Sequence, residues 1–198
     1  MSSEEHVRVN PATSEVMTKR LRIRPWSRND VDAALQIFGD EQVARWLTPA
    51  VYHIKNRDDM TTLLESWIRE SDGSGLPLGR WAIEYPQTGS VIGAVALLPL
   101  PPGGTDLEIG WQIASPYWGQ GYGAEAGHAV AHRAFGAGAR EVFAVVRPGN
   151  RRGIATARRV GMEWVGETTK YYGMTMQVYR LTKADLDHPE PSTDTSYA

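Results

Sequence analysis

Apolar and polar residues alternate along the first part of the chain in patterns that predict one strand and two helices. RLRIRPW, residues 20–26, alternates basic and apolar side chains as a half-buried strand does, and Pro25 ends it. Residues 27–40 open with helix-capping side chains, then place apolar residues at helical spacing, and stop near Gly39. Residues 58–71 repeat the helical spacing with acidic residues in the first turn, where the helix dipole favours them.

The middle of the chain reads as three strands. RWAIEY, residues 80–85, and SVIGAVALLPL, residues 90–100, are apolar runs joined by the short turn PQTG, which predicts an antiparallel hairpin. After a second turn, PPGG, residues 105–114 supply a third apolar run, TDLEIGWQIA. We therefore expect three neighbouring strands here.

The last part returns to mixed elements. Alanine-rich residues 124–138 predict a helix closed by glycine, residues 141–148 a strand, and residues 150–161 a helix capped by asparagine. Residues 163–181 read as two strands around a turn near Gly173. The predicted order is β-α-α-β-β-β-α-β-α-β-β, which is an α+β or mixed-sheet domain.

Length and composition favour one globular domain. A chain of 198 residues with 41% hydrophobic and 22% charged residues suits a single soluble core. No repeat or linker interrupts it, so we assign residues 18–186 to the domain. Residues 1–17 and 187–198 are polar and unpatterned, which predicts flexible tails.

Several classes of protein are disfavoured by composition and charge. The absence of cysteine excludes disulfides and thiolate chemistry, and the first residues lack the pattern of a signal peptide. The longest apolar run is too short to span a bilayer, so we expect a cytoplasmic protein that does not insert into membranes. The net charge of −2 argues against general nucleic-acid binding. The carboxy-terminal half nevertheless carries an arginine cluster, which indicates a local site for an anion.

The stretch WGQGYGAEA contains glycine at positions 119, 121 and 123, directly before a predicted helix. Glycine weakens helices and strands by roughly 0.5–1 kcal/mol relative to alanine, so this concentration needs an explanation. A strand followed by glycines and then by the start of a helix can bind phosphate. The first N–H groups of the helix are unpaired, and glycine lets the phosphate approach the backbone closely. A tight turn that needs positive φ is the alternative interpretation.

Two common phosphate motifs do not fit the stretch. A P-loop requires Gly-Lys-Ser/Thr, but Ala124 and Glu125 follow Gly123. The dinucleotide pattern G-x-G-x-x-G/A is formally present, with Glu141 downstream as its acidic residue. However, Pro-Tyr-Trp separates the glycines from the strand, and Glu141 begins a strand instead of ending one. A nicotinamide enzyme is therefore the weaker hypothesis.

The run EIGWQIASPYWGQGYGAEA, with the later NRRGIATARRVGM, resembles the GNAT superfamily of N-acetyltransferases, and in particular its RimJ/RimL-like branch. Gly121 and Gly123 occupy the glycine positions of the superfamily signature, Q/R-x-x-G-x-G/A. Trp118 replaces its first Gln or Arg, as is usual in the branch. The resemblance covers about residues 18–186 and implies a mostly antiparallel mixed sheet flanked by helices.

The resemblance implies acetyl-CoA, or another short acyl-CoA, as co-substrate and no metal. The glycine loop would hold the pyrophosphate, the preceding strand would lie along the pantetheine arm, and the arginines would contact the 3′-phosphate. The residues implied are Gln112, Ile113, Ala114, Trp118, Gly119, Gln120, Gly121, Tyr122, Gly123, Ala124, Asn150, Arg151, Arg152 and Arg158.

The resemblance also implies catalytic residues. Glu108 matches the position of the general base that makes the acceptor amine neutral. The backbone N–H of Gln112 is the candidate to polarise the thioester carbonyl. The family's usual thiolate-protonating positions hold Gly153 and Ala157. Either the thiolate leaves unassisted or another hydroxyl serves, with Tyr171 and Tyr172 as candidates, of which we retain Tyr172.

The predicted function is transfer of an acyl group to a primary amine, in a small molecule or at a protein N-terminus. The acidic balance of residues 1–110, with 11 basic and 15 acidic residues, mildly favours a cationic acceptor. Trp46 and residues 44–57 lie where relatives cover the acceptor, and a homodimer is possible. The two other hypotheses are an acyl-CoA-binding module without catalysis, suggested by Gly153 and Ala157, and the nicotinamide enzyme.

Overall fold

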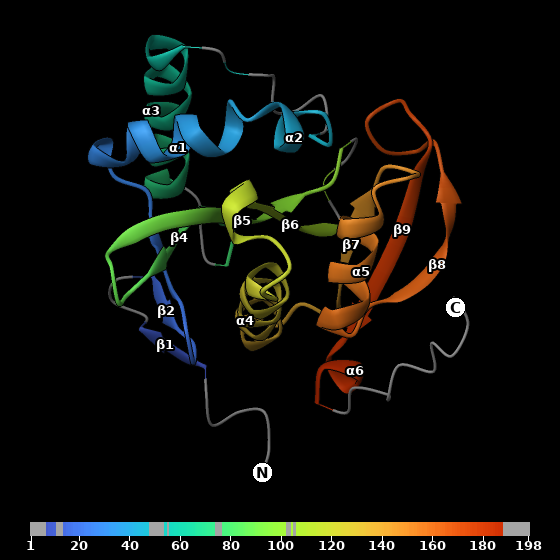
Figure 1. Ribbon diagram of the computed structural model, residues 1–198. Helices are drawn as coiled ribbons and strands as arrows, with labels where there is room; N and C mark the ends of the chain where they lie inside the picture. Colours follow the sequence, from blue (N-terminus) through green and yellow to red (C-terminus); the bar gives the residue numbers. More distant parts are fainter. Residues whose placement is uncertain are drawn as a thin grey trace.

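The computed structural model describes residues 7–10, 14–47, 54, 56–73, 77–101, 104 and 106–187. Their strands form one sheet, in the order β1-β2-β3-β4-β5-β6-β7-β9-β8 (Figure 1). In chain order the strands are β1 Arg8–Asn10, β2 Glu15–Met17, β3 Arg22–Pro25, β4 Gly79–Tyr85, β5 Ser90–Pro99, β6 Leu107–Ile113, β7 Glu141–Val146, β8 Glu163–Thr168 and β9 Met176–Thr182. The α+β prediction with a mostly antiparallel sheet is confirmed, because every pairing except β6 with β7 is antiparallel.

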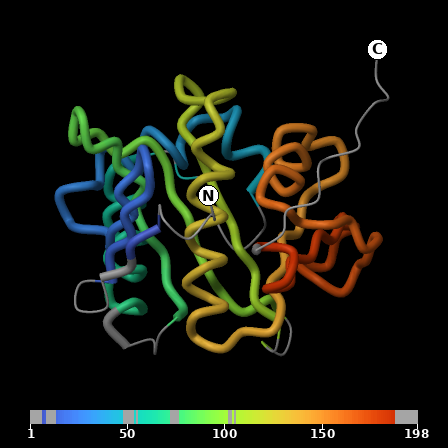
Figure 2. The backbone as a smooth tube through the Cα atoms, turned by 90° about the horizontal axis from the view of Figure 1, so that it is seen from below, coloured from blue at the N-terminus to red at the C-terminus, as the bar shows by residue number. Residues whose placement is uncertain are grey.

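Helices cover both faces of the sheet. The α-helices are α1 Val31–Phe38, α2 Glu41–Ala44, α3 Arg57–Gly73, α4 Tyr122–Gly136, α5 Arg151–Val160 and α6 Lys183–Asp187, and two short 3-10 turns are η2 Arg28–Asp30 and η3 Ser115–Tyr117. Figure 1 shows α1 and α3 on one side of the sheet and α4 and α5 on the other. Seen from below, α4 runs across the middle of the molecule, between the amino-terminal strands and β7 to β9 (Figure 2).

The alternation of side chains along β4 and β5 divides the interior into two cores. Trp81, Ile83 and Val95 pack with α4 in the larger core. Ala82 and Ala94, one position out of phase, pack with α1 and α3 in the other. The small side chains on the α1/α3 face leave room between the sheet and these helices, where large aromatic residues are found instead.

The sheet is split at its one parallel pairing in the described chain. Glu108 of β6 pairs with Phe143 of β7, and no further pair joins these two strands in the described part. The carboxyl ends of β6 and β7 therefore diverge, and the backbone groups of β6 that face β7 are not used by the sheet. This opening is the feature of the fold that creates a site.

The amino-terminal segment differs from the prediction of a tail over residues 1–17. Within it, β1 pairs with β2, and β2 continues the sheet by pairing Val16 with Ile23 of β3. Val16 is 1% exposed, so the segment contributes to the core. Three-residue strands are too short to show a period of two, which is why the pattern did not reveal them. Of the predicted tail over residues 187–198, Asp187 ends α6 and the rest lies outside the described residues.

Candidate active site

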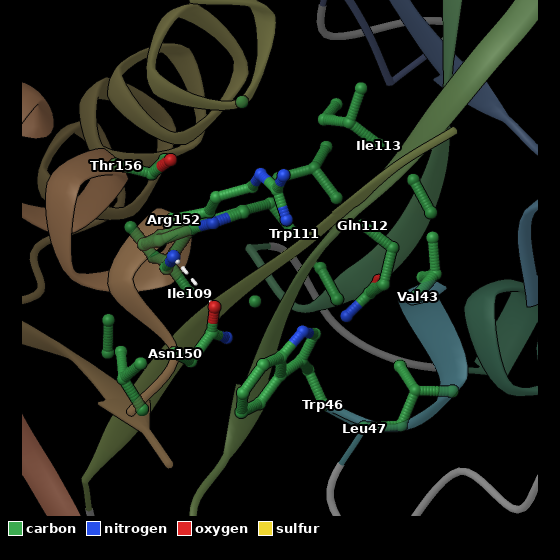
Figure 3. Close-up of a pocket in the computed structure, with 18 of the residues that line it drawn as sticks. Val43, Trp46, Leu47, Ile109, Trp111, Gln112, Ile113, Asn150, Arg152 and Thr156 are labelled. Carbon is green, nitrogen blue, oxygen red and sulfur yellow. Dashed lines mark hydrogen bonds between the residues drawn. The ribbon is translucent and has the colours of Figure 1, made fainter. Parts of the chain in front are cut away.

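A cavity of about 330 Å³ occupies the opening between β6 and β7. Figure 3 shows Asn150, Arg152 and Thr156 on one side, Trp46 and Leu47 on the other, and β6 residues such as Gln112 between them. The cavity thus runs from the starts of α4 and α5, through the sheet, to the aromatic residues beneath α1 and α3. Two reactants entering from opposite faces of the sheet could meet here.

The glycine stretch forms the loop that begins α4. Gly119 has φ of +78° and Gly121, the N-cap of α4, has φ of +80°, so both use a conformation that other residues adopt only at a cost. Gly123 is different, because it lies within the helix and a Cβ there would make an ordinary contact of 3.4 Å with Thr156 Cγ2 on α5. Gly119 and Gly121 therefore shape the turn, and neither the backbone angle nor the space requires glycine at position 123.

Glu125 fastens the loop to the turn between β2 and β3. Its carboxylate accepts hydrogen bonds from Thr18 Oγ1 at 2.6 Å, from the backbone N–H of Arg20 at 2.9 Å and from Arg20 Nε at 2.6 Å. Arg20 Nη1 also donates to the carbonyl of Gln120 at 2.9 Å, and its guanidinium lies over the Tyr122 ring. The turn between β2 and β3 therefore fixes the backbone of the loop.

Asn150 caps α5 at the opposite wall of the cavity. Its Oδ1 accepts a hydrogen bond from the N–H of Gly153 at 3.0 Å, a partner that Figure 3 marks with a dashed line. A Cβ at Gly153 would lie 2.7 Å from Asn150 Nδ2 and 2.9 Å from Val146 Cγ1, so no side chain fits there without movement. Ala157 is fully buried. Neither position can offer a hydroxyl to the cavity.

Arg152 and Trp118 meet across the cavity mouth. The Arg152 guanidinium lies 4.2 Å from the Trp118 ring centroid, and Trp118 Nε1 donates a 2.7 Å hydrogen bond to the carbonyl of Ile113. The second arginine of α5 that lines the cavity is Arg159, whereas Arg151 and Arg158 do not line it. The roles predicted for Arg151 and Arg158 remain predictions.

Most of the other residues predicted to contact the co-substrate lie at the cavity, and two do not. Those that line it are Gln112, Ile113, Trp118, Gly119, Gly121, Tyr122, Gly123, Ala124, Asn150 and Arg152. Ala114 is buried, with its N–H donating to the carbonyl of Ile92, and Gln120 is exposed, with its carbonyl engaged by Arg20.

Glu108 and Tyr172 form the titratable pair of the cavity. Tyr172 Oη donates a 2.5 Å hydrogen bond to Glu108 Oε2, and both residues line the cavity. Burial raises the pKa of Glu108 to about 7, although the Tyr172 hydroxyl, the Arg80 charge and the Val145 N–H act in the opposite direction. A carboxyl group with this pKa can accept a proton near neutral pH.

Tyr172 reaches Glu108 from a strained turn between β8 and β9. Its φ of +57° is unusual for a bulky residue and costs of order 1–3 kcal/mol. The neighbouring candidate, Tyr171, is directed elsewhere: its hydroxyl donates to Asp106 Oδ2 at 2.8 Å and it does not line the cavity. Of the two predicted tyrosines, the structure therefore brings Tyr172 to Glu108.

The backbone of Gln112 does not suit the oxyanion role predicted for it. Gln112 pairs with Ala94 of β5, and the N–H of Ala114, two residues on, donates to the carbonyl of Ile92 at 2.9 Å. Because backbone groups alternate in direction along a strand, the N–H of Gln112 also faces β5. The amides that face the opening are those of Trp111 and Ile113. The Gln112 side chain does line the cavity.

Three residues that line the α1/α3 side of the cavity were not among the predicted site residues: Trp26, Arg80 and Arg147, although Arg147 belongs to the arginine cluster of the sequence. Arg80 lies on β4, and its guanidinium is 5.3 Å from the Trp67 ring centroid. Arg147 follows β7 and donates from Nη1 to the carbonyl of Arg45 at 3.0 Å. Little in the sequence pointed to Arg80, because it is the first residue of the run RWAIEY, where a charged residue is usually exposed.

Comparison with known proteins identifies the family. The sequence model described as "Acetyltransferase (GNAT) domain" matches residues 20–163, well over half of the chain. The chain belongs to the GNAT acetyltransferase family. It is 28% identical over 179 residues to YkkB of Bacillus subtilis, a protein of uncharacterized function, and the match covers 85% of this chain and 95% of YkkB.

Solved structures share the fold of this GNAT chain. A GNAT-family acetyltransferase from Bacillus anthracis superimposes with a TM-score of 0.71 at 18% identity, covering 86% of this chain and 99% of that one. Mycobacterium smegmatis RimJ, solved in complex with CoA-disulfide, gives a TM-score of 0.71 at 18% identity, with 92% and 88% covered. Across the described residues, no helix is both long and apolar enough to cross a membrane.

Proposed function

We propose that this protein is an N-acetyltransferase that transfers an acetyl group from acetyl-CoA directly to a primary amine in a ternary complex. The observation that carries the proposal is the cavity through the split sheet, with the α4 and α5 helix starts at one end and the Glu108–Tyr172 pair within it. Membership of the acetyltransferase family supports acyl transfer, and the geometry supports an amine as acceptor.

The α4/α5 side suits an acyl-CoA. The loop from Gly119 to Gly121 exposes backbone at the positive end of α4, where a pyrophosphate is stabilised. Arg152 adds a positive charge at the same mouth. The unpaired edge of β6 offers backbone groups to the amide-containing pantetheine arm. The structure of the RimJ relative with CoA-disulfide is consistent with this assignment.

The chemistry requires one proton to move from the amine to the departing thiolate. As the new C–N bond forms and the C–S bond breaks, Glu108 takes the proton from the amine, directly or through a water. Tyr172 gives its own proton to the thiolate and recovers one from Glu108 through the existing hydrogen bond. This relay assigns to Tyr172 the role that Gly153 and Ala157 cannot perform. The amides of Trp111 and Ile113 face the position where the thioester oxygen would develop charge.

Mass spectrometry of amines incubated with protein and acetyl-CoA tests the proposal. We expect a gain of one acetyl group on a primary amine, and a loss of roughly 10²–10⁴-fold in rate in Glu108→Gln. Glu163→Gln is the matched control, because Glu163 is exposed and pairs with Arg180 on β9. Acetyl-CoA binding without transfer to any amine would support the binding module instead, and NADH binding that survives excess CoA would support the nicotinamide enzyme.

A further inference from the structure

The α1/α3 wall of the cavity has an excess of hydrogen-bond donors. Trp26 Nε1, Arg80 Nε and Arg147 Nε are buried and have no hydrogen-bond partner among the described residues. All three residues line this one cavity. A buried donor without a partner costs about 1–3 kcal/mol, so the wall favours a ligand that brings acceptor atoms.

Strand register places two of these donors side by side. Pro25 of β3 pairs with Trp81 of β4, so the next position along each strand sets Trp26 beside Arg80. Arg80 in turn pairs with Ala96 of β5, and Ala96 pairs with Gly110 of β6. The row therefore begins at Trp26, just past the end of β3, and crosses β4 and β5 to Gly110 of β6 on one face of the sheet.

The middle of this row is open. Ala96 and Gly110 both line the cavity, and a Cβ added at Gly110 would meet nothing within 4 Å. Two strand spacings, about 10 Å, separate the Arg80 and Gly110 backbones, and the long arginine side chain crosses part of that gap. Glu108 stands two residues from Gly110 on the same face of β6. A small molecule lying over Ala96 and Gly110 would have Glu108 at one end and Arg80 at the other.

Aromatic rings hold Arg80 and shape the adjoining space. The Trp67 ring is 5.3 Å from the Arg80 guanidinium, 6.2 Å from the Trp26 ring and 5.1 Å from the Phe38 ring. Arg80 has Glu70 as an ion-pair partner, but the distance of 3.8 Å exceeds a hydrogen bond and the Glu70 side chain is 62% exposed. The guanidinium is thus oriented by a ring, and the Glu70 and Glu108 carboxylates are the acids that act on its charge.

The charges of the cavity argue against the cationic acceptor suggested by the acidic first half of the sequence. Among the described residues that line the cavity, Glu108 is the only acid, whereas Arg80 and Arg147 are cations on the same side. When Glu108 takes a proton from the amine, this side of the cavity is left with positive charge alone. An anionic group on the acceptor would balance it.

We propose that the acceptor is a small primary amine with a carboxylate close to the amino group and an apolar body, and that Arg80 binds the carboxylate. This inference rests on the proposed function, because it places the amine at Glu108. The Trp26 N–H is the second donor to the carboxylate, and Trp67 and Phe38 pack against the apolar body. A peptide N-terminus fits less well, because the group next to its amine is a neutral peptide carbonyl.

Matched pairs of amines test the carboxylate. L-phenylalanine and L-leucine are compared with L-phenylalaninamide and L-leucinamide, and with spermidine and an N-terminal tetrapeptide, by kcat/KM at fixed pH and saturating acetyl-CoA. We expect Arg80→Gln to lower kcat/KM for the acids by roughly 10- to 100-fold and for the amides by much less. Arg80→Lys should recover part of the preference for the acids over the amides, because lysine keeps the positive charge but lacks the paired N–H donors of the guanidinium.

The ratio of acid to amide separates carboxylate binding from other roles of Arg80. A structural role, or an effect on Glu108 alone, would lower both rates equally and leave the ratio unchanged, and that outcome overturns the inference. Arg28→Gln is the control, because Arg28 is 81% exposed, pairs with Glu65 and does not line the cavity. Transfer only to spermidine or to the tetrapeptide would overturn the carboxylate site and leave the proposed function standing.

A binding measurement keeps the two proposals distinguishable. Calorimetry can measure the affinity of the protein for N-acetyl-L-phenylalanine and for N-acetyl-L-phenylalaninamide, and this measurement does not depend on turnover. Tighter binding of the acid, lost in Arg80→Gln, together with no transfer to any amine, would support the carboxylate site and reject the proposed function. No preference for the acid in the wild-type protein would reject the carboxylate site, whatever the turnover.

Discussion

The hydroxyl of Tyr172 donates a 2.5 Å hydrogen bond to the carboxylate of Glu108, across 64 positions of sequence. Glu108 lies on β6, where the sheet splits, and Tyr172 lies in the turn between β8 and β9. The turn must adopt a positive φ at Tyr172 to make the contact. Backbone strain at a buried acid–hydroxyl pair is typical of a catalytic centre, where surrounding structure maintains a geometry that the chain alone disfavours.

Tyr172→Phe should change the pH dependence of acetyl transfer. The Tyr172 hydrogen bond lowers the pKa of Glu108, so its removal moves that pKa upward from about 7. The acidic limb of kcat/KM against pH should therefore shift to higher pH, and the maximal rate should fall by at least about tenfold if the hydroxyl protonates the thiolate. Tyr171→Phe is the control, because the Tyr171 hydroxyl donates to Asp106 and should leave the limb in place. An unchanged limb in Tyr172→Phe would contradict the coupling.

Glu108 should also make the folded state less stable at higher pH. Its pKa rises from an ordinary value of 4.5 to about 7 on folding, so the folded protein binds more protons between these values. The contribution is favourable below pH 4.5 and is lost as pH rises through 7. At 1.36 kcal/mol per pH unit, the loss is of order 3 kcal/mol. Denaturant unfolding at pH 5 and pH 8 should show Glu108→Gln gaining stability relative to wild type at pH 8. An equal difference at both pH values would argue against the raised pKa.

The outline of the fold was predictable because its long elements have strong periodicity. The strands at residues 80–85 and 90–100 and the helix after the glycines are all present in the structure. Short elements such as β1, β2 and α2 carry too few residues to show a period, so the β1–β2 hairpin and the turn after it, which fastens the glycine loop, were missed.

The site was predictable only where its residues are near one another in sequence. The glycine loop and Asn150 each form a local motif that can be read directly. Arg80 joins the cavity through register across β4, β5 and β6, and the direction of the Gln112 amide depends on which neighbour β6 pairs with. Neither the place of Arg80 nor the direction of the Gln112 amide can be predicted from one segment alone, because both depend on which strands pair and in which register.

Arg20→Ala should weaken binding of acetyl-CoA while largely sparing catalysis. Arg20 ties Glu125 and the Gln120 carbonyl together, so its loss frees the loop from the turn between β2 and β3. Charge-assisted hydrogen bonds contribute about 1.5–3 kcal/mol, which predicts roughly a 10- to 100-fold rise in KM for acetyl-CoA with little change in kcat. Arg57→Ala is the matched control, because it breaks only an exposed ion pair with Asp32. A fall in kcat with KM unchanged would show that Arg20 acts on the chemical step instead.

Gly110→Val should block the acceptor and leave the fold intact. A Cβ at Gly110 meets no atom within 4 Å, and the residue lies on a strand, where valine is favoured. The added methyl groups would project over the space between Arg80 and Glu108. We expect kcat/KM for the amine to fall by about 10- to 200-fold, as for an unaccommodated carbon atom in a tight pocket, with the midpoint of thermal unfolding unchanged or higher. Gly136→Ala is the control, because that position at the end of α4 is equally open and does not line the cavity. Full activity in Gly110→Val would mean that the acceptor does not lie over β6. A lower kcat/KM with an unchanged midpoint of unfolding is expected only where the added side chain occupies space that the substrate needs.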